Sequence, residues 1–483
     1  MASNRSAPQS VRSAVGIAVR LTMALSIVVF LLMMLFGLIM RMAQGALLEL
    51  SPDLFYQIMT AHGTGMVGTA GLAGAAIMWH FLNRHVRPSV SVYWLFLALV
   101  LIGVVLILAG IFIGGFAGGW TFLYPLPAHS GAVWGTHAAF SFIAGLLLVG
   151  VGFLLFYLDA ARAIIGRYRN FSNALGWPTL VEREQSDIPP PAIVASSAVI
   201  IINTIALVVG AVILAITAIN LYVPSFSFDP LLAKNFIYFF GHVFINATIY
   251  MAVIAVYEIM PAYTGRPWKT SRLLIAGWSA TLIMAMAVYP HHLFQDAVMP
   301  GWMLAMGQVL SFASGIPVIV ITTYALLSYV YRSGIRWDLP SSLLTLGVFG
   351  WADGIIPAII DGMIVVNKVM HNTLWVPGHF HFYLLLGMVA MALGFAAWLV
   401  QGEKPSATMT LAHKLAFGGL LVGGLGLVLT FLYAGKESVP RRWAVHAPEW
   451  IGQDRLGSAF AALVVLATAA IAIRYLSRCA RSS

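Results

Sequence analysis

The sequence has little charge and almost no cysteine. Only 9% of its 483 residues are charged and 60% are apolar, whereas a soluble domain carries about 25% charged residues. This shortage of charge excludes an ordinary water-soluble globular protein. The single cysteine, Cys479, excludes an intrachain disulfide and a thiolate-held copper or iron-sulfur centre. Any bound metal must therefore be held by imidazole or carboxylate groups.

The sequence is rich in long apolar runs. Runs of about 20 residues, enough to cross a hydrocarbon core of roughly 30 Å, recur along the chain. We count about twelve, which predicts an all-α membrane protein, and we expect the first to be a retained helix because it is too long for a signal peptide. The runs cover residues 14–42, 55–82, 92–116, 133–160, 192–221, 235–261, 272–290, 303–331, 341–366, 373–401, 410–434 and 457–476.

The basic residues divide unevenly between the two sides of these spans. If the N-terminus is cytoplasmic, that side collects 19 of the 26 lysines and arginines, and the other side collects 26 − 19 = 7, among them Arg41. Cytoplasmic loops of membrane proteins carry such an excess. The net charge of +10 therefore reports topology rather than a nucleic-acid partner, and both termini are expected in the cytoplasm.

Polar insertions between the spans are short. The longest, at about 162–191, includes Glu182, Glu184 and three consecutive prolines and predicts a cytoplasmic loop. The other, at about 435–456, predicts an external loop. We find no internal repeat of the kind that builds transporters from inverted halves. The interpretation is one membrane domain over residues 1–483.

Six of the thirteen histidines reach a similar depth in the predicted bundle. Three lie roughly 7 residues, or about 10 Å, into spans that enter from the external side, and an adjacent pair ends the seventh span on that same side. An intramembrane histidine is costly and is by default a functional candidate, although packing explains any single one equally well. The six are His62, His242, His291, His292, His379 and His381.

His379 and His381 are two residues apart, so on a helix they point about 200° apart. One helix can therefore serve two metals. His62 could complete a bis-imidazole pair with one of these histidines, as on a low-spin haem. The other would hold a second haem with an open face.

His291 and His292 stand at a helix end, where the backbone can leave helical geometry and let both rings converge. His242 would supply a third nitrogen. Three imidazoles with an open position suit copper, and zinc is possible on ligand chemistry alone.

These residues resemble those of subunit I of the haem-copper oxidase superfamily, and the B-type branch most closely. Residues 371–381, HNTLWVPGHFH, are similar to that family's helix 10 signature, while Gly241-His242 and Tyr289-Pro290-His291-His292 are similar to its copper motifs. The resemblance implies two haems, of unspecified type, and one copper, CuB. It implies that His379 binds the high-spin haem, that His62 and His381 bind the low-spin haem, and that His242, His291 and His292 bind CuB.

An arginine pair extends the resemblance outside the spans. Pro440-Arg441-Arg442-Trp443 is similar to the family's external arginines that hold haem propionates, a role that bidentate arginine-carboxylate chemistry suits. The alternative is two ordinary loop arginines. His371 is expected near a propionate.

One position departs from the oxygen-reducing branches. There a tyrosine four residues after the first copper histidine is covalently joined to it, whereas this chain has Asn246. Tyr257 and Pro261 fit the family's register, and Tyr250 is about 12 Å along the axis from His242, too far to substitute directly. That phenol is the family's extra electron and proton donor for splitting O2, and reducing two NO molecules to N2O needs only two electrons.

Asn246 therefore favours nitric oxide reduction, and it resembles a described branch of nitric oxide reductases with three copper histidines and this asparagine. The alternative is a cytochrome c oxidase that reduces O2 to water, possibly with proton pumping, and draws its extra electron from a residue such as Tyr289. A haem-bearing transporter or sensor is disfavoured by the complete set of histidines.

Electrons must come from outside the chain, because the sequence has no Cys-x-x-Cys-His motif for a c-type haem. The resemblance implies a membrane-anchored cupredoxin-type subunit II, fed by cytochrome c or a similar carrier, in the cytoplasmic (inner) membrane of a bacterium, surrounded by membrane lipid. Proton transfer needs a polar route. Hydroxyl residues of the sixth and eighth spans could line it, although a hydroxyl bonded to its own helix is the commoner case for each; they are Tyr257, Ser311, Ser314, Thr322 and Thr323.

Overall fold

The computed structural model describes residues 9–181, 187–406 and 408–482, and within these ranges the chain is built of helices. Twelve helical spans are long and apolar enough to cross a membrane, which confirms the predicted fold class. The prediction also placed Glu182 and Glu184 in a loop, but these residues lie outside the described ranges.

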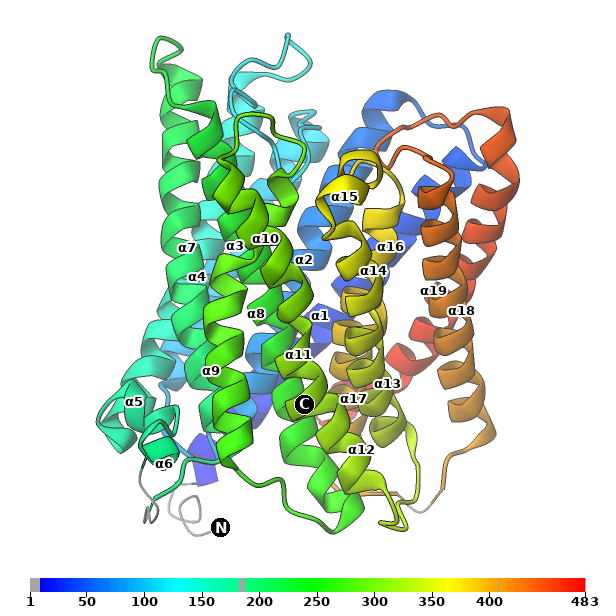
Figure 1. Cartoon of the computed structure of the whole chain (residues 1–483). Helices are drawn as coiled ribbons and strands as arrows, with labels where there is room; N and C mark the ends of the chain where they lie inside the picture. Colours follow the sequence, from blue (N-terminus) through cyan, green and yellow to red (C-terminus); the bar gives the residue numbers. More distant parts are fainter. Residues whose placement is uncertain (1–8, 182–186, 407, 483) are drawn as a thin grey trace.

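Six spans are single continuous helices, and six are either broken or contain a π- or 3-10 segment (Figure 1). The continuous ones are α1 (Gln9–Gln44), α2 (Pro52–Leu82), α4 (Thr136–Tyr168), α7 (Pro191–Tyr222), α8 (Pro230–Thr264) and α18 (Leu411–Lys436). The composite ones are α3 (Val90–Leu108) with the π-helix Ala109–Ile113; α9 (Arg272–Ala287) with the 3-10 helix Tyr289–Leu293; α10 (Gly301–Ala313), α11 (Gly315–Val318), the π-helix Ile319–Tyr324 and α12 (Ala325–Val330); α13 (Leu339–Asp353) with α14 (Ile355–Asp361); α16 (Trp375–His381), the π-helix Phe382–Val389 and α17 (Ala390–Val400); and the 3-10 helix Pro448–Trp450 with α19 (Ile451–Ser482). Short helices α5 (Phe171–Ala174), α6 (Pro178–Val181) and α15 (Ile364–Met370) lie in the connections.

The two predicted polar loops are shorter than expected. Helix α4 continues to Tyr168 with Arg162 and Arg167 in its last turns, where basic side chains complement the carboxyl end of a helix. On the other side, the twelfth span already begins at Pro448. Its Asp454 is fully buried and pairs with Arg41 of α1, so this part of the predicted loop is packed helix.

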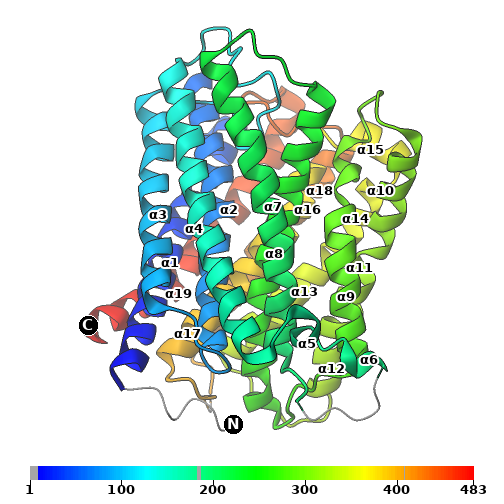
Figure 2. The same cartoon turned by 90° about the vertical axis from the view of Figure 1, so that its left-hand side faces the viewer.

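The spans run roughly side by side, and α1 begins at the same end of the bundle at which α19 finishes (Figure 2). The most buried are α2, α8 and the tenth span, with 72–78% of their central windows buried, against 33–50% in the other nine. These three spans therefore form the centre of the bundle, and each carries predicted metal-binding histidines.

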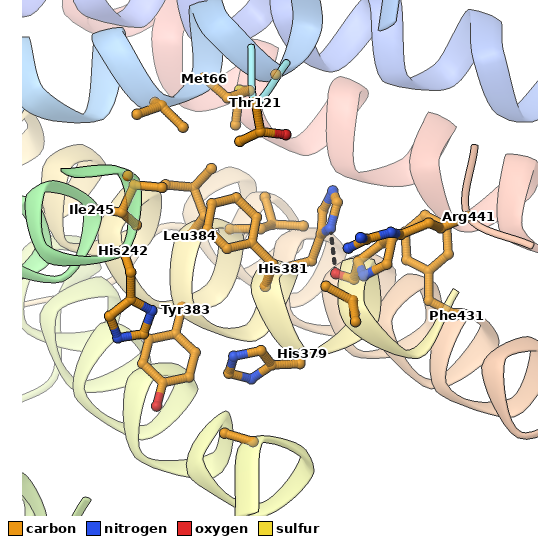
Figure 3. A pocket seen from close by; sticks show the side chains of 18 of the residues that line it. Met66, Thr121, His242, Ile245, His379, His381, Tyr383, Leu384, Phe431 and Arg441 are labelled. Carbon is orange, nitrogen blue, oxygen red and sulfur yellow. Dashed lines mark hydrogen bonds between the residues drawn. The ribbon is translucent and has the colours of Figure 1, made fainter. Parts of the chain in front are cut away.

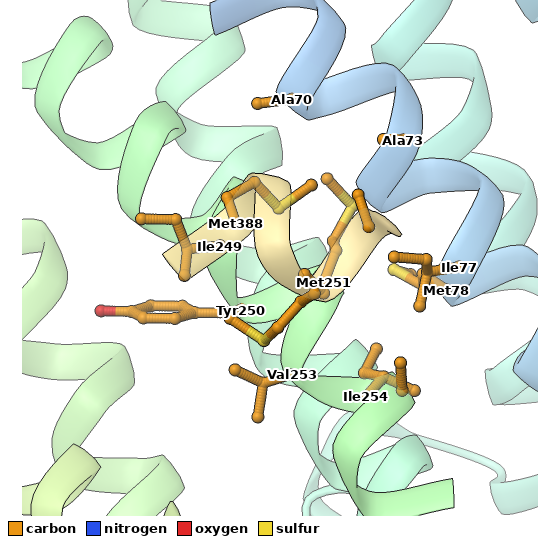
Figure 4. Packing of buried hydrophobic residues seen from close by; sticks show 14 of the residues in the cluster. Ala70, Ala73, Ile77, Met78, Ile249, Tyr250, Met251, Val253, Ile254 and Met388 are labelled. Carbon is orange, nitrogen blue, oxygen red and sulfur yellow. The ribbon is translucent and has the colours of Figure 1, made fainter. Parts of the chain in front are cut away.

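Small residues let the central helices approach closely, as is usual in membrane bundles. Figure 4 shows Ala70, Ala73 and Ile77 of α2 facing Met251 of α8 and Met388 of the tenth span, and all five side chains are at most 1% exposed. A β-carbon at Gly74 would stand 3.0–3.1 Å from Met251 atoms. This tight packing fixes the relative positions of the helices that carry the site.

Candidate metal centres

One cavity of about 410 Å³ collects the predicted functional residues from many parts of the chain. It is lined by all six histidines, by Asn246 and by Arg441 and Arg442. Figure 3 shows the two tenth-span histidines on different sides of their helix, with His379 on the side of His242 and His381 on the other. The spacing argument for opposite orientations therefore agrees with the structure.

His62 of α2 and His381 of α16 face each other as a parallel pair. Their ring centroids are 6.4 Å apart and the ring planes differ by 15°. Metal-imidazole bonds are about 2.0–2.1 Å long, so the gap accommodates one metal ion between two ring nitrogens. This geometry fits the bis-imidazole coordination of a low-spin haem.

Each of the three candidate haem ligands makes the same kind of hydrogen bond, from Nδ1 to a backbone carbonyl. Nδ1 of His62 donates to the carbonyl of Met33 at 2.6 Å, Nδ1 of His381 to that of Pro377 at 2.7 Å, and Nδ1 of His379 to that of Gly354 at 3.0 Å. A backbone acceptor on one nitrogen fixes the tautomer and leaves the other nitrogen as the ligand. All three rings are thus held with Nε2 available.

Two glycines make these contacts sterically possible. A β-carbon at Gly37 of α1 would lie 2.9 Å from Cε1 of His62, so only glycine lets α1 pass this close to the ring. Gly354 joins α13 to α14, and a β-carbon there would stand 2.6 Å from Cδ2 of Tyr383, the residue whose ring packs edge-on against His379 with centroids 4.8 Å apart.

His242, His291 and His292 form a separate cluster in which one nitrogen from each ring lies within 4.8 Å of the others. His291 and His292 belong to the 3-10 helix that follows α9, at Pro290. Proline lacks an amide hydrogen and ends regular α-helix, so the change in winding allows adjacent side chains to converge. Three neutral imidazoles in this arrangement fit the donor set of copper.

Each ring of this cluster is oriented by a further contact. His291 Nδ1 donates to Ser311 Oγ at 3.0 Å, and that hydroxyl donates to the Gly307 carbonyl at 2.6 Å. Ser311, predicted as a proton-path residue, therefore positions a candidate ligand. His292 Nδ1 lies 3.4 Å from His371 Nε2, and His371 Nδ1 donates to Asp361 Oδ2 at 2.9 Å.

The third ring is held by Asn246. Its Nδ2 lies 2.8 Å from His242 Nε2 and 3.0 Å from the His242 carbonyl oxygen, while His242 Nδ1 points to His292 Nε2 at 3.0 Å. His242 therefore presents Nδ1 to the shared site and Nε2 to the asparagine. Asn246 follows His242 by one helical turn and contacts this Nε2 edge of the ring.

Arg441 and Arg442 lie at the cavity wall. Arg441 Nη2 donates to Asn372 Oδ1 at 3.4 Å and Arg442 Nη2 to Thr121 Oγ1 at 3.1 Å. Arg441 Nε is buried with no protein partner among the described residues. Burial, followed by the neighbouring Arg442, lowers the pKa of Arg441 to about 10. Arg441 therefore stays cationic at neutral pH, which suits it to bind a carboxylate of a haem.

The sequence interpretation missed a buried ion pair beside His381. Arg41 Nη2 bonds Asp454 Oδ1 at 2.5 Å, and His446 Nδ1 bonds Asp454 Oδ2 at 2.6 Å. Arg41 lines the cavity and stacks over Phe431, whose ring also contacts that of His381. Arg41 at the end of the first apolar run was the one signal in the sequence, because Asp454 fell in the predicted external loop and the two residues are 413 positions apart.

The predicted proton-path residues and the nearby tyrosines differ in their hydrogen bonds and in whether they line the cavity. Tyr257 and Thr322 are hydrogen-bonded at 2.9 Å, and Ser314 lines the cavity. Thr323 Oγ1 is buried without a partner among the described residues. Tyr289 donates to Asn235 Oδ1 at 3.0 Å and does not line the cavity, whereas Tyr250 and Tyr383 do.

In the described part of the chain, twelve helices long enough to cross a membrane enclose a cavity that contains a parallel histidine pair and a three-histidine cluster, an arrangement typical of membrane proteins that bind redox metals. A family model described as "Cytochrome C and Quinol oxidase polypeptide I" matches residues 17–472. The chain belongs to this family, subunit I of the haem-copper oxidases, and is a membrane oxidoreductase. Members of the family normally bind haems and copper.

Similar proteins carry the same family name. Cytochrome c oxidase polypeptide 1 of Halobacterium salinarum is 24% identical over 438 residues, 87% of this chain and 70% of the relative. Cytochrome c oxidase subunit 1 of Synechocystis is 25% identical over 428 residues, 84% of this chain and 70% of the relative. A haem-copper terminal oxidase dimer solved by cryo-electron microscopy superposes with a TM-score of 0.78 at 20% identity, covering 96% of this chain and 84% of that one. This last likeness shows the fold.

Proposed function

We propose that this chain is the catalytic subunit of a respiratory nitric oxide reductase, which converts two NO, two electrons and two protons into N2O and water. The observation that carries the proposal is the contact between Asn246 Nδ2 and His242 Nε2 at 2.8 Å. In the oxygen-reducing branches that this sequence resembles, a tyrosine at this position is bonded to the copper histidine. An amide cannot supply the electron that a phenol supplies.

The histidines divide into three roles in this proposal. His62 and His381 would hold a low-spin haem that receives electrons, His379 would hold a high-spin haem, and the cluster His242, His291 and His292 would hold CuB. When bound, the high-spin haem and copper supply the two electrons that joining two NO molecules requires. The protein supplies the ligand geometry, which the backbone carbonyls and Ser311 fix before any metal binds.

Protons must reach the cavity through the apolar bundle. The hydrogen-bonded pair Tyr257 and Thr322 and the cavity-lining Ser314 lie on the sixth and eighth spans. We propose that these hydroxyls belong to the proton route, since polar groups facing a bundle interior commonly mark such routes.

The Arg441 and Arg442 guanidinium groups would hold the haem propionates by charge-assisted hydrogen bonds.

A second candidate function is the reduction of O2 to water, because the relatives reported above are named cytochrome c oxidases. It requires a phenol near the metals. Tyr289 is a poor source, since its hydroxyl donates to Asn235 away from the cavity. Tyr383, edge-on to His379, is the better placed phenol for this alternative.

The proposed setting is a bacterial cytoplasmic (inner) membrane with both chain ends in the cytoplasm and the whole chain acting as one domain. A membrane-anchored cupredoxin-type subunit II, supplied by cytochrome c or a similar carrier, would deliver electrons. One relative, 24% identical over 233 residues, is named "Heme-copper oxidase subunit I+III" of Aeropyrum pernix. Its name describes a subunit I joined to another subunit.

The test is a side-by-side measurement of NO and O2 consumption by the purified complex with the same reduced donor. The proposal expects turnover of NO to exceed turnover of O2. Turnover of O2 that greatly exceeds that of NO would establish the second candidate instead. Metal analysis of the same preparation must show copper, since its absence would overturn the assignment of the three-histidine cluster.

A further inference from the structure

A second cavity, of about 360 Å³, lies away from the metal centres where α2 and α4 end. Its walls are residues 83–87, which follow α2, and four residues in the last two turns of α4. Four of the lining residues are arginines, and a histidine adds to them; within the described chain no lining residue is acidic. They are Arg84, His85, Arg87, Arg162 and Arg167, and we call this cavity the basic pocket.

Acidic side chains hold several of these cations from outside the basic pocket. Arg162 donates from Nε and Nη2 to Asp159 Oδ1 at 3.0 and 2.7 Å, and Asp159 also accepts from the Ser89 amide at 2.6 Å. Arg167 Nη2 lies 3.8 Å from Asp187. A guanidinium has five N–H donors, so a carboxylate on one edge orients the group and leaves donors for a second anion.

The positions of the span ends place the basic pocket at the expected depth of lipid head groups. The α2 span ends at Leu82 and the α4 span at Tyr168, so its arginines lie at the boundary of the apolar bundle. On α4 the side chains Val151, Leu158 and Ile165 are 46%, 50% and 38% exposed. Their seven-residue spacing, two helical turns, places them on one face, and this apolar track runs along α4 and ends at Ile165, next in sequence to Gly166 of the basic pocket.

We propose that the basic pocket binds the phosphate of an anionic glycerophospholipid whose acyl chains lie along Val151, Leu158 and Ile165. Arginine recognises phosphate by paired hydrogen bonds, and basic pockets between transmembrane helices are suited to anionic head groups. A zwitterionic head group would bring its own ammonium next to the arginines, which opposes binding. The apolar track selects a lipid over a free phosphate.

Gly166 offers a way to fill the basic pocket without changing its charge. It lines the cavity, and a β-carbon added there would have nothing within 4 Å. Gly166→Leu therefore places its side chain in open space and also improves helix propensity. Arg162→Gln/Arg167→Gln removes two charges and keeps the volume. The matched control is Arg332→Gln/Arg336→Gln, which removes two charges from a connection that does not line the cavity.

The experiment is native mass spectrometry of the intact complex in mild detergent, titrated with phosphatidylglycerol, with phosphatidylcholine, or with phosphatidylglycerol in the presence of inorganic phosphate. We expect wild type and the control to retain phosphatidylglycerol in preference to phosphatidylcholine and to keep it in phosphate. The double arginine variant should retain it about thirtyfold more weakly, at about a factor of five per charge, and Gly166→Leu should lose it without losing charge.

Equal retention of both lipids by the wild type, or unchanged retention in both pocket variants, would overturn the proposal. Displacement of phosphatidylglycerol by inorganic phosphate would also overturn it, because the pocket would then be a site for soluble anions.

Discussion

At the residue scale, the proposed use of NO as substrate rests on Asn246. Its amide contacts both Nε2 and the carbonyl of His242, so it fixes the ring that presents Nδ1 to the cluster with His291 and His292. A hydrogen bond to a buried partner contributes about 1 kcal/mol net. Asn246→Ala is therefore expected to lower NO turnover about five- to tenfold while copper and haem contents stay near those of wild type.

The control for this variant is Asn220→Ala, which removes an asparagine that bonds the Phe226 carbonyl far from the cavity lining. Steady-state NO consumption with a gas electrode is the measurement. If Asn246→Ala turns over at the wild-type rate with full metal content, the contact with His242 has no part in catalysis.

Arg441 gives a prediction with a defined pH range. Its pKa is lowered from 12.5 to about 10, so the side chain is protonated throughout pH 6–9 and loses its charge only as pH rises through about 10. A nearby cation stabilises the reduced form of a haem. Arg441→Gln should lower a haem midpoint potential by roughly 50 mV, and the difference from wild type should stay constant over pH 6–9.

Redox titration followed by optical spectra measures this shift. Arg455→Gln is the control, because Arg455 bonds the Gly45 carbonyl and does not line the cavity. A shift of equal size in both variants would mean that the effect is not specific to Arg441 at the cavity wall.

Single residues were predictable from the sequence where depth in the membrane and a local motif coincide. All six histidines and both loop arginines were predicted on this basis, and all of them line the cavity. The residues that hold these side chains in place were harder to predict from the sequence. Arg41 with Asp454 and His371 with Asp361 are pairs whose contacts depend on helix packing, and neither partner's position reveals the other without the fold.

At the element scale, the apolar runs predicted where spans lie and did not predict how they are wound. Hydropathy is equally high in α-, π- and 3-10 helices, so the π-helix Phe382–Val389 next to His381 and the break between α13 and α14 left no mark on the pattern. The 3-10 helix Tyr289–Leu293 is the exception, because the position of the adjacent histidines at the end of a predicted span indicated that the backbone could leave α-helical geometry.

Helix α1 contacts the proposed low-spin haem site through Gly37. A β-carbon there would stand 2.9 Å from His62 Cε1, so Gly37→Val must displace the ring from its parallel partner His381. We expect the variant to lose the low-spin haem spectrum and keep its copper, since His242, His291 and His292 are on other helices.

Optical and electron paramagnetic resonance spectra, together with copper analysis, check this outcome. Gly16→Val on the same helix is the control, because a β-carbon there meets only the flexible end of Arg20 at 3.7 Å. Retention of the low-spin signal by Gly37→Val would contradict the placement of a haem between His62 and His381.

At the scale of the whole molecule, twelve apolar runs determined the fold class, since hydrogen-bonded helices are the only structures that such runs can form across a bilayer. Which helices become central could not be derived from composition. Spans α2, α8 and the tenth are distinguished by burial rather than by hydropathy, and burial follows from packing.

The proposed orientation can be tested with the one native thiol. Cys479 lies near the end of α19, which finishes at the same end of the bundle where α1 begins (Figure 2). If this end is cytoplasmic, a membrane-impermeant maleimide should label the chain in inverted vesicles and not in right-side-out vesicles, unless the membrane is permeabilised. Cys479→Ser is the control, and labelling in right-side-out vesicles would reverse the orientation.

The central claim is that this subunit makes N2O from NO at the site formed by His379 and the cluster His242, His291 and His292. The most direct measurement supplies ¹⁵NO and reduced donor to the purified complex and counts ¹⁵N2O by mass spectrometry. The account predicts one N2O for every two NO and two electrons, and loss of the product in His242→Ala. A wild-type complex with full haem and copper content that reduces O2 and forms no ¹⁵N2O above a heat-denatured control would contradict it.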